Sequence, residues 1–237
     1  MKLEFLFEDE SVVAANKPAG LLSIQDRHDS EIPNLAEELR ITFGEIFVVH
    51  RLDRGTSGVI LFAKNPSAHR ALNLQFESHT AVKKYIAVIE GIMRESHGTI
   101  SLPLALDARR PGTMHVDESN GKESLTEFTV IHSFKRFSAI EITLHTGRQH
   151  QIRVHFAATG HPVVCDGVYG KSETFLLSSI KRKFKSAGTE KPLIARTALH
   201  ASELTFYHPV ANERITVTAP IPHDIATLLK QLEKWDR

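Results

Sequence analysis

The sequence predicts an α+β fold with a mixed, mostly antiparallel β-sheet. Short runs rich in Val, Ile, Phe and Thr, bounded by Gly, Pro, Asn or Asp, outnumber the segments with helical periodicity. The two kinds of segment do not alternate strictly, as the β-α-β units of a parallel sheet would require. We therefore expect one α+β domain spanning residues 1–237.

Eight runs have the length and composition of β-strands. They occupy Leu3–Phe7, Ser11–Asn16, Gly58–Ala63, Lys84–Glu90, Leu125–His132, Ser138–His145, Leu199–Thr205 and Arg214–Ala219.

Four segments have the apolar spacing of helices: Ile32–Phe43, Ser67–His79, His150–Thr159 and His223–Trp235. Ser67 follows Pro66 and is the expected N-cap of the second helix, whereas Gly160 is expected to end the third. The basic segment Phe175–Lys191 lies between two β-rich regions, and we interpret it as a helix-plus-loop insertion within the domain.

Composition narrows the class of protein. Hydrophobic residues make up 41% and charged residues 24%, which is ordinary for a globular chain. The first residues lack the pattern of a signal peptide, and no apolar run reaches the length of a membrane span, so we expect a cytoplasmic protein without a membrane partner. The single cysteine, Cys165, excludes an intrachain disulfide and a cysteine metal cluster.

The net charge of +1 neither requires nor excludes binding to RNA, because an enzyme that visits RNA needs only a basic face. Basic residues gather at Lys83–Lys84, at Arg109–Arg110 and in the segment 181–185. Each cluster is open to two interpretations, a solvated surface or a local contact with phosphates.

The segment His50–Gly58 carries an unusual arrangement, in which Asp53 lies between Arg51 and Arg54 in a turn of small residues before an apolar strand. Neighbouring guanidinium groups favour an ionised carboxylate, which is a poor general acid at neutral pH but a possible nucleophile or charge stabiliser. The alternative is a surface turn with a structural Arg–Asp pair.

A second polar segment, Gly147–His155, crowds charged and amide groups around the start of the third helix. Arg148 and the first amides of that helix predict an anion site. Three histidines, His145, His150 and His155, could be considered as metal ligands, but their five-residue spacing turns successive side chains apart on a helix, so we expect no metal.

The third segment, Lys83-Lys84-Tyr85, opens a predicted strand. A tyrosine beside lysines can stack on a base while the lysines contact phosphates. Packing of the ring against a cross-strand neighbour is the alternative.

These segments, taken together and in order, resemble the RluA-type pseudouridine synthases. The matching motifs are Asn16–Leu22, His50–Asp53 with Thr56–Gly58, Lys84–Tyr85, Gly147–His155, Gly160–Pro162 with Asp166–Gly167 and Tyr169–Gly170, and Leu199–Ala201 with His208–Pro209. The resemblance extends over residues 3–220. No S4-like RNA-binding module precedes residue 3, so we expect a stand-alone catalytic domain.

The resemblance implies a bent sheet with flanking helices and a central RNA-binding cleft. It implies an isomerase that converts specific uridines of structured rRNA or tRNA to pseudouridine without a cofactor. The protein is expected to be a monomer with RNA as its partner. Unpaired regions of RNA are the expected targets, because flipping a nucleotide out requires least free energy there.

The resemblance also implies the roles of individual residues. Asp53 is the expected catalytic carboxylate, Arg153 its ion-pair partner, and Tyr85 the ring that stacks on the base and the candidate general base. The expected substrate-binding residues are Arg51, which would occupy the space left by the flipped nucleotide, and His50, Thr56, Lys84, Arg148, His150 and Gln151.

Two other classes of function compete with this one. A non-catalytic RNA-binding protein on the same scaffold would keep a basic groove but would not need Asp53 together with Tyr85 and Arg153. A metal-dependent nuclease would need clustered carboxylates, and the sequence has no conspicuous pair of them.

Overall fold

The computed structural model describes residues 3–185 and 188–237. The chain forms two compact units. Unit 1 comprises Met1–Lys84 and His200–Pro220, and unit 2 comprises Tyr85–Leu199 and Ile221–Arg237. The expectation of a single domain stays a prediction.

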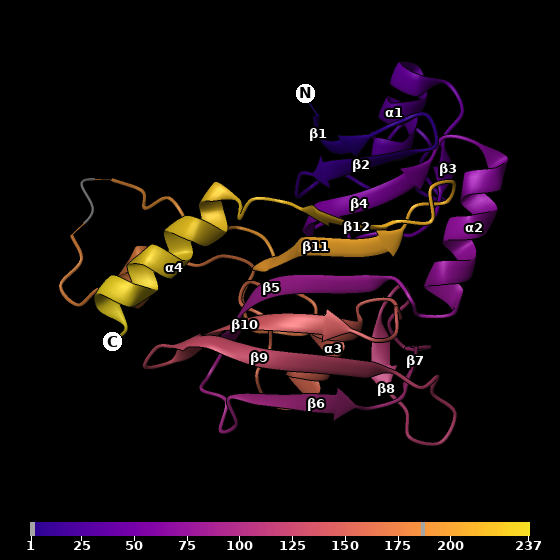
Figure 1. Cartoon of the computed structure of the whole chain (residues 1–237). Coiled ribbons are helices and arrows are strands. Elements are labelled where there is room, and N and C mark those ends of the chain that lie inside the picture. The colour runs from indigo at the N-terminus through magenta and orange to yellow at the C-terminus, as the bar shows by residue number, and fades with distance from the viewer. Residues whose placement is uncertain (1–2, 186–187) are drawn as a thin grey trace. The chain divides into compact units, whose positions relative to one another are not determined.

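Unit 1 is built on a mixed sheet (Figure 1). Its strands are ordered β1 (Glu4–Glu8), β2 (Val12–Lys17), β4 (Ser57–Ala63) and β11 (Leu199–Tyr207), with β12 (Arg214–Thr218) beside β11 and β3 (Phe47–Val48) beside β4. The pairs are antiparallel except for β4 and β11, which run parallel where Ser57 and Gly58 meet His200 and Ala201.

Two helices complete unit 1: α1 (Leu35–Phe43) and α2 (Pro66–Glu77), which packs beside β4. Every residue of β4 is buried, and alternate side chains such as Val59 and Leu61 pack with Leu72 of α2 and Phe206 of β11. An apolar core therefore underlies the segment that leads into β4.

Unit 2 contains an antiparallel arrangement of β10 (Phe137–Leu144), β9 (Leu125–Ser133) and β6 (His97–Ser101). Strand β5 (Val82–Glu90), which belongs to this unit from Tyr85 onward, lies next to β10. A separate pair is formed by β7 (Leu104–Leu106) and β8 (Met114–Val116). The helices are α3 (Gln151–Ala158), which packs against β8 and β9, and α4 (His223–Trp235). The mixed, mostly antiparallel sheet with helices confirms the predicted α+β class.

All eight expected strands and four expected helices are present, but some boundaries differ. The second helix is capped by Asn65 and not by Ser67, because the Asn65 side chain accepts a hydrogen bond from the Ala68 N–H group and Pro66 occupies the first turn. The first helix starts at Leu35 and not at Ile32, because Asn34 caps it in the same way.

The prediction of a helix within Phe175–Lys191 is wrong for the described part of that segment. Its helical structure there is limited to the short 3-10 turn Leu177–Ser179. Residues 186–187 of the segment lie outside the described residues. No helix among the described residues is long and apolar enough to cross a membrane.

Candidate active site

Asp53 lies half-buried in the loop between β3 and β4 of unit 1. Its carbonyl oxygen accepts a hydrogen bond from the Thr56 N–H group at 3.0 Å, which closes a turn immediately before β4. Leu52 and Thr56 are buried on either side of Asp53, whereas Arg51 and Arg54 are exposed. The turn that carries the Asp53 carboxylate is therefore flanked by two buried residues, Leu52 and Thr56.

Buried side chains hold the main chain of this loop at both ends. The Ser23 hydroxyl donates to the Leu52 carbonyl oxygen at 2.8 Å and accepts from the Leu52 N–H group at 3.0 Å. Lys17, which is 0% exposed, donates from Nζ to the carbonyl oxygens of Leu21, Pro18 and Arg54. The opening motif thus supports the Asp53 loop through its backbone.

Two further hydrogen bonds join Gly20 to Arg54. The Gly20 N–H group donates to the Arg54 carbonyl oxygen at 2.7 Å, and the Arg54 Nε–H donates back to the Gly20 carbonyl oxygen at 3.0 Å. Gly20 has a φ of +89°, a backbone conformation that residues other than glycine rarely adopt. One role of Arg54 is therefore to fix the backbone beside Asp53.

His50 begins the loop and is held by the sheet. Its Nε2 accepts a hydrogen bond from the Leu61 N–H group at 3.0 Å, and its ring stacks on Phe76 with 4.7 Å between ring centroids. Burial, and second the charge of Lys83, lower the pKa of His50 to about 3, so its ring is neutral. The neutral ring is the form that can accept from Leu61.

At the start of β4 the chain meets β11 closely. The Ser57 hydroxyl and Nδ1 of His200 lie 2.9 Å apart in a buried hydrogen bond. Gly58 has a φ of +116°, and an added Cβ would collide with the backbone of Ala201. Only glycine fits this position, because both the conformation and the space exclude a side chain.

In unit 2, the residues of the second polar segment open α3. His150 adopts a left-handed conformation with a φ of 53°, and the helix proper begins at Gln151. The Gln151 amide is 2% exposed and makes four hydrogen bonds. Its oxygen accepts from Thr146 and from the Arg148 N–H group, and its nitrogen donates to the Leu125 carbonyl oxygen and to Thr126.

Arg153 of α3 forms a bidentate ion pair with Asp166. Nε and Nη2 donate to the two carboxylate oxygens at 2.7 and 2.8 Å, and both side chains are buried. Burial by itself would raise the pKa of Asp166, but hydrogen bonds and charge from Arg153, with the N–H groups of Tyr169 and Val168, hold that pKa below its usual value. Asp166 is therefore an ionised counter-charge that orients the guanidinium group.

The guanidinium carbon of Arg153 also lies 5.1 Å from the centre of the Tyr169 ring. The Tyr169 hydroxyl accepts from the Met114 N–H group and lies 2.8 Å from Nδ1 of His150. Tyr169 thus links the start of α3 to β8 and covers Arg153.

The three histidines of the considered metal site contact different partners. His145 pairs with Glu127, His150 bonds Tyr169, and Nε2 of His155 lies 2.9 Å from the Leu102 carbonyl oxygen. Among the described residues, no group of three His, Cys, Asp or Glu side chains is placed to hold a metal ion.

At the start of β5, the residues alternate in exposure. Lys83 and Tyr85 are each 8% exposed, whereas Lys84 between them is more accessible and lies 3.9 Å from a carboxylate oxygen of Glu203. Burial lowers the pKa of Lys83, whose Nζ lies 5.9 Å from the centre of the Phe76 ring. Lys83 was not among the expected site residues.

The predicted site residues fall into two groups. Unit 1 holds His50, Arg51, Asp53, Thr56 and Lys84, and unit 2 holds Tyr85, Arg148, His150, Gln151 and Arg153. Their assigned roles, including the pairing of Asp53 with Arg153, stay predictions.

The sequence did not assign the supporting roles of Lys17, Ser23, Asp166, Tyr169 and His200. All but Ser23 stand in the quoted motifs, so the motifs were a signal for them. Ser23 has no such signal, because its role depends on hydrogen bonds to Leu52, which lies 29 residues later in the sequence.

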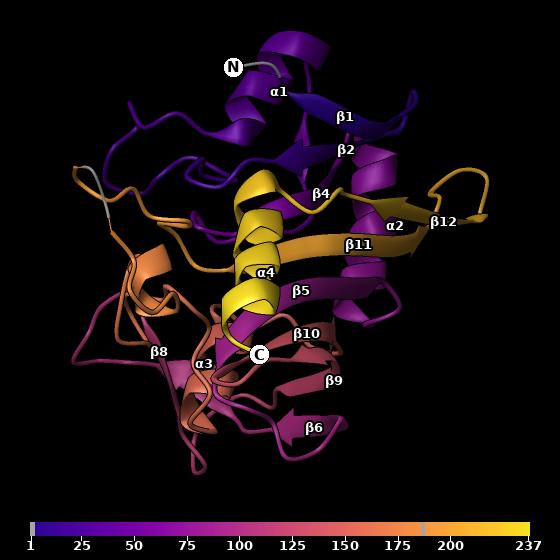
Figure 2. The same cartoon turned by 90° about the vertical axis from the view of Figure 1, so that its left-hand side faces the viewer.

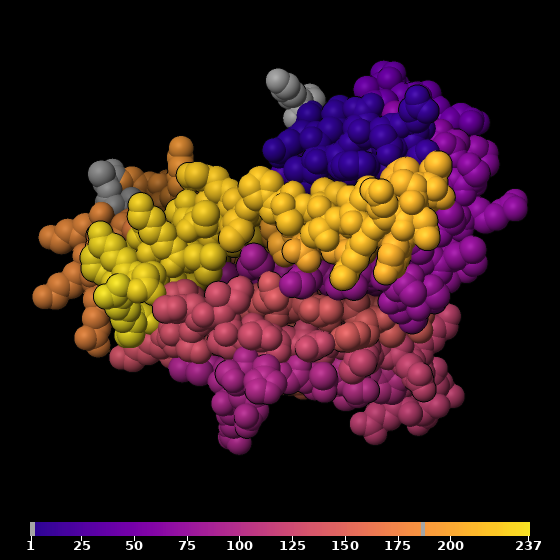
Figure 3. Space-filling model, in the orientation of Figure 1, coloured from indigo at the N-terminus to yellow at the C-terminus, as the bar shows by residue number. Residues whose placement is uncertain are grey.

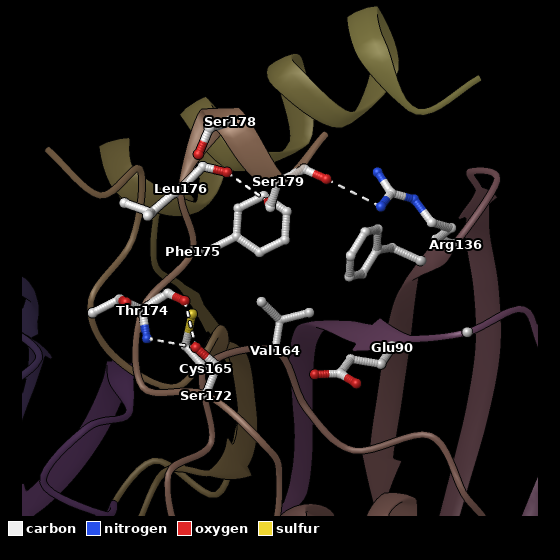
Figure 4. Close-up of a pocket in the computed structure, with 12 residues that line it drawn as sticks. Glu90, Arg136, Val164, Cys165, Ser172, Thr174, Phe175, Leu176, Ser178 and Ser179 are labelled. Atoms are coloured by element: carbon white, nitrogen blue, oxygen red, sulfur yellow. Dashed lines mark hydrogen bonds between the residues drawn. The ribbon is translucent and has the colours of Figure 1, made fainter. Parts of the chain in front are cut away.

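Unit 2 also contains a pocket of about 520 Å³ that none of the predicted site residues lines (Figure 4). Phe137 and Phe175 meet edge to face in it with 5.3 Å between centroids, and the Glu90 carboxylate points into it. Cys165 lines it from a buried position, where burial first and the Glu90 charge second raise the thiol pKa to about 12. The thiol is therefore protonated and unreactive as a nucleophile.

Comparison with known proteins agrees with the motifs. The family model described as RNA pseudouridylate synthase matches residues 11–158. The uncharacterized RNA pseudouridine synthase YhcT of Bacillus subtilis is 37% identical over 97% of this chain and 72% of its own length. The dual-specificity RNA pseudouridine synthase RluA of Vibrio cholerae is 34% identical over 92% of this chain and 82% of its own.

A solved structure, human RNA pseudouridylate synthase domain containing 1, matches with a TM-score of 0.69 and 30% identity over 92% of this chain and 83% of that one. Human RNA pseudouridylate synthase domain containing 4 has a TM-score of 0.72 over 97% and 93% of the two chains, and at 21% identity it supports the fold alone. The chain therefore belongs to the RNA pseudouridine synthase family and is an RluA-type isomerase that acts on uridine in RNA.

Proposed function

We propose that Asp53 is the catalytic carboxylate of this synthase. The anchoring of its loop supports the proposal: Ser23 fixes the preceding residue and Lys17 contacts the following one, so the carboxylate projects from a backbone that is held on both sides. A fixed backbone suits a reaction in which the attacking or stabilising oxygen must meet C1′ or C6 of one flipped nucleotide.

The reaction balances without a cofactor. The N1–C1′ bond breaks, the uracil turns, and a C5–C1′ bond forms, while the proton on C5 leaves and N1 gains a proton. Asp53 would stabilise or trap the detached fragment. Tyr85 would stack on the base and, in a glycal route, take the C2′ proton as the N1–C1′ bond breaks and return it to C2′ as the C5–C1′ bond forms. Tyr is among the side chains that serve as general acid–base groups.

Arg153 is proposed as the ion-pair partner of Asp53. Asp166 binds Nε and Nη2 of its guanidinium group, and such an orienting carboxylate would direct Nη1 toward a second anion. In this arrangement Asp166 is a positioning residue that keeps the plane of the guanidinium group fixed.

The remaining assigned residues would bind the RNA. Arg51 is exposed and can enter the space that the flipped nucleotide leaves, and Arg148 and Lys84 can contact phosphates. His50, Thr56, His150 and Gln151 are engaged with the protein, and their contribution would be to shape the site.

The RNA is proposed to be ribosomal or transfer RNA, with an unpaired target uridine. Among the relatives are enzymes named for dual specificity and for the large ribosomal subunit, which supports this class. The protein is further proposed to work as a monomer in the cytoplasm. Mapping pseudouridine at nucleotide resolution in cells with and without the gene tests the choice of RNA, and an unchanged map of both RNA classes would contradict it.

Asp53→Asn tests the central assignment, because it keeps the shape of the side chain and removes the charge and the nucleophile. Single-turnover conversion of RNA should vanish, while the Kd for RNA changes only a few-fold. Glu45→Gln removes one charge from an exposed position of the same unit and should convert RNA normally. Measurable turnover by Asp53→Asn would overturn the assignment.

Tyr85→Phe separates chemistry from packing, because it keeps the ring and deletes only the hydroxyl. If the hydroxyl acts as a base, single-turnover conversion falls by about 10²–10⁴-fold. The Kd for RNA should be unchanged, since the stacking surface remains. A Phe variant with normal turnover would remove Tyr85 from the chemistry and leave it a stacking residue.

A further inference from the structure

A basic surface of unit 2 lies outside the predicted catalytic residues. In the segment 181–185, every residue except Phe184 is basic. Arg182, Lys183 and Lys185 are exposed, and α4 adds the exposed Lys234. We name Lys181, Arg182, Lys183, Lys185, Lys234 and Trp235 the Trp235 surface.

Trp235 joins the two parts of this surface. Trp235 is 37% exposed, and the Nζ atoms of Lys181 and Lys234 lie 4.7 and 5.0 Å from the centre of its ring. Figures 1, 2 and 3 show the orange segment that carries residues 181–185 beside the yellow α4. An aromatic ring that holds two ammonium groups keeps their positive charges close together despite their repulsion.

Arg136 forms hydrogen bonds with residues next to both parts of the surface. Its Nε–H donates to Asp236 at 2.7 Å and its backbone N–H donates to the same carboxylate at 2.8 Å, immediately after Trp235. Its Nη1 donates to the Ser179 carbonyl oxygen at 3.1 Å, two residues before Lys181 (Figure 4). Ile180, between Ser179 and Lys181 in the sequence, is buried. Lys181 and Lys234 therefore project from an anchored backbone, which is more order than a merely solvated surface requires.

We propose that the Trp235 surface binds phosphates of the RNA substrate outside the nucleotide that reacts. The proposal rests on the RNA-modifying function above and extends it to a docking site. Compact ammonium groups neutralise phosphates, and an exposed aromatic ring among cations is typical of surfaces that follow a single strand. Its contribution is to affinity, and the chemical step at the target uridine does not depend on it.

The chain offers its own probe, because Trp235 is its single tryptophan. We would titrate the full-length protein with a short polyuridylate and follow tryptophan emission, and repeat the titration at several salt concentrations. Binding at the surface should change the emission, since a phosphate draws the ammonium groups away from the ring or a base stacks on it.

The test variant is Arg182→Gln/Lys183→Gln/Lys185→Gln, whose three positions are exposed. If these residues contact three phosphates, the salt slope falls by about 2, so the wild type loses about 15-fold more affinity than the variant between 50 and 200 mM salt. The matched control, Arg70→Gln/Arg94→Gln/Arg214→Gln, removes three exposed charges elsewhere and should retain the wild-type slope.

Each outcome decides the proposal. The proposal is overturned if the test variant has the same salt slope and the same emission change as the wild type. It is also overturned if the control's salt slope falls as much as that of the test variant, because net charge alone would then explain the fall. Single-turnover conversion at saturating RNA should be the same in all three proteins. Absence of conversion by the wild type would instead contradict the assigned function, so the two failures are distinguishable.

Discussion

The Asp53 loop and helix α3 both place polar groups inside a folded unit, but they are held in opposite ways. In the loop, a few buried side chains bond the main chain: Ser23 bonds Leu52, and Lys17 bonds three carbonyl oxygens. In α3, the candidate site side chains Gln151 and Arg153 are themselves buried and bond other side chains, as Arg153 does with Asp166.

The difference separates two kinds of sensitivity. Loss of a loop anchor frees a short stretch of backbone that can move without unfolding its sheet, so it should alter catalysis at least as much as stability. Loss of a partner in α3 leaves a buried charge or amide unpaired, so it should reduce the free energy of unfolding first. The four predictions below test this contrast, from the largest expected effect to the smallest.

Asp166→Ala should be the most damaging change, because it leaves the Arg153 guanidinium buried without its bidentate partner. We expect the free energy of unfolding in urea to fall by about 3–5 kcal/mol. Glu37→Ala removes the partner of Arg40 at a pair whose side chains are both exposed, and it should lower the free energy of unfolding far less. Equal losses in the two variants would abolish the contrast that we draw for α3.

Gln151→Ala removes four hydrogen bonds at a buried position and should come second. Each buried group left unsatisfied lowers stability by about 1–3 kcal/mol. The neighbouring Gln149→Ala, at a partly exposed position, should have a much smaller effect on the melting temperature. If Gln151→Ala melts normally but binds RNA weakly, Gln151 is a direct RNA contact and the buried network is unimportant.

Ser23→Ala removes both hydrogen bonds to Leu52 and tests the loop. The expected fall in stability is about 1–3 kcal/mol, and the fall in single-turnover rate is about 10²-fold, since small displacements of a reacting group have large effects. Ser67→Ala, which removes an exposed hydroxyl bonded to Asn65, is the control. A stable Ser23→Ala enzyme with the full rate would show that the anchor does not position Asp53.

His50 makes stability depend on pH. Its pKa is about 3 in the folded protein and near 6.5 when unfolded, so protons favour the unfolded state and stability is lost as pH falls below 6.5. Between pH 7 and pH 5.5 the loss should be about 1 kcal/mol. His50→Gln should flatten the urea-unfolding profile in this window, whereas the exposed His223→Gln should not. An unchanged profile in His50→Gln would mean that the ring can be protonated in place.

The sequence predicted the regular elements well, because their apolar periods and turn residues are local signals. One error lies where a different local residue supplied the cap, as Asn65 did in place of Ser67. Another is the helix expected within Phe175–Lys191, where the described residues form only a short 3-10 turn. The many polar residues of Gly147–His155 also predicted that the α3 segment needs hydrogen-bond or ion-pair partners. The partner that completes the Arg153 pair, Asp166, lies 13 residues away in a non-helical segment. Asp166 stands in a quoted motif, but nothing in the sequence pairs its carboxylate with Arg153.

The sequence by itself determined the α+β class, the family, and the motif in which Asp53 stands, because these depend on residue type and order. Only the tertiary structure decided that Lys17 and Ser23 anchor the loop. It also decided that the Gln151 amide makes its hydrogen bonds within unit 2 and that Lys181 contacts the Trp235 ring. Hydrogen bonds and ring contacts form between groups that are close in space. Lys181 and Trp235 are 54 residues apart in the sequence, and no periodic pattern marks their contact.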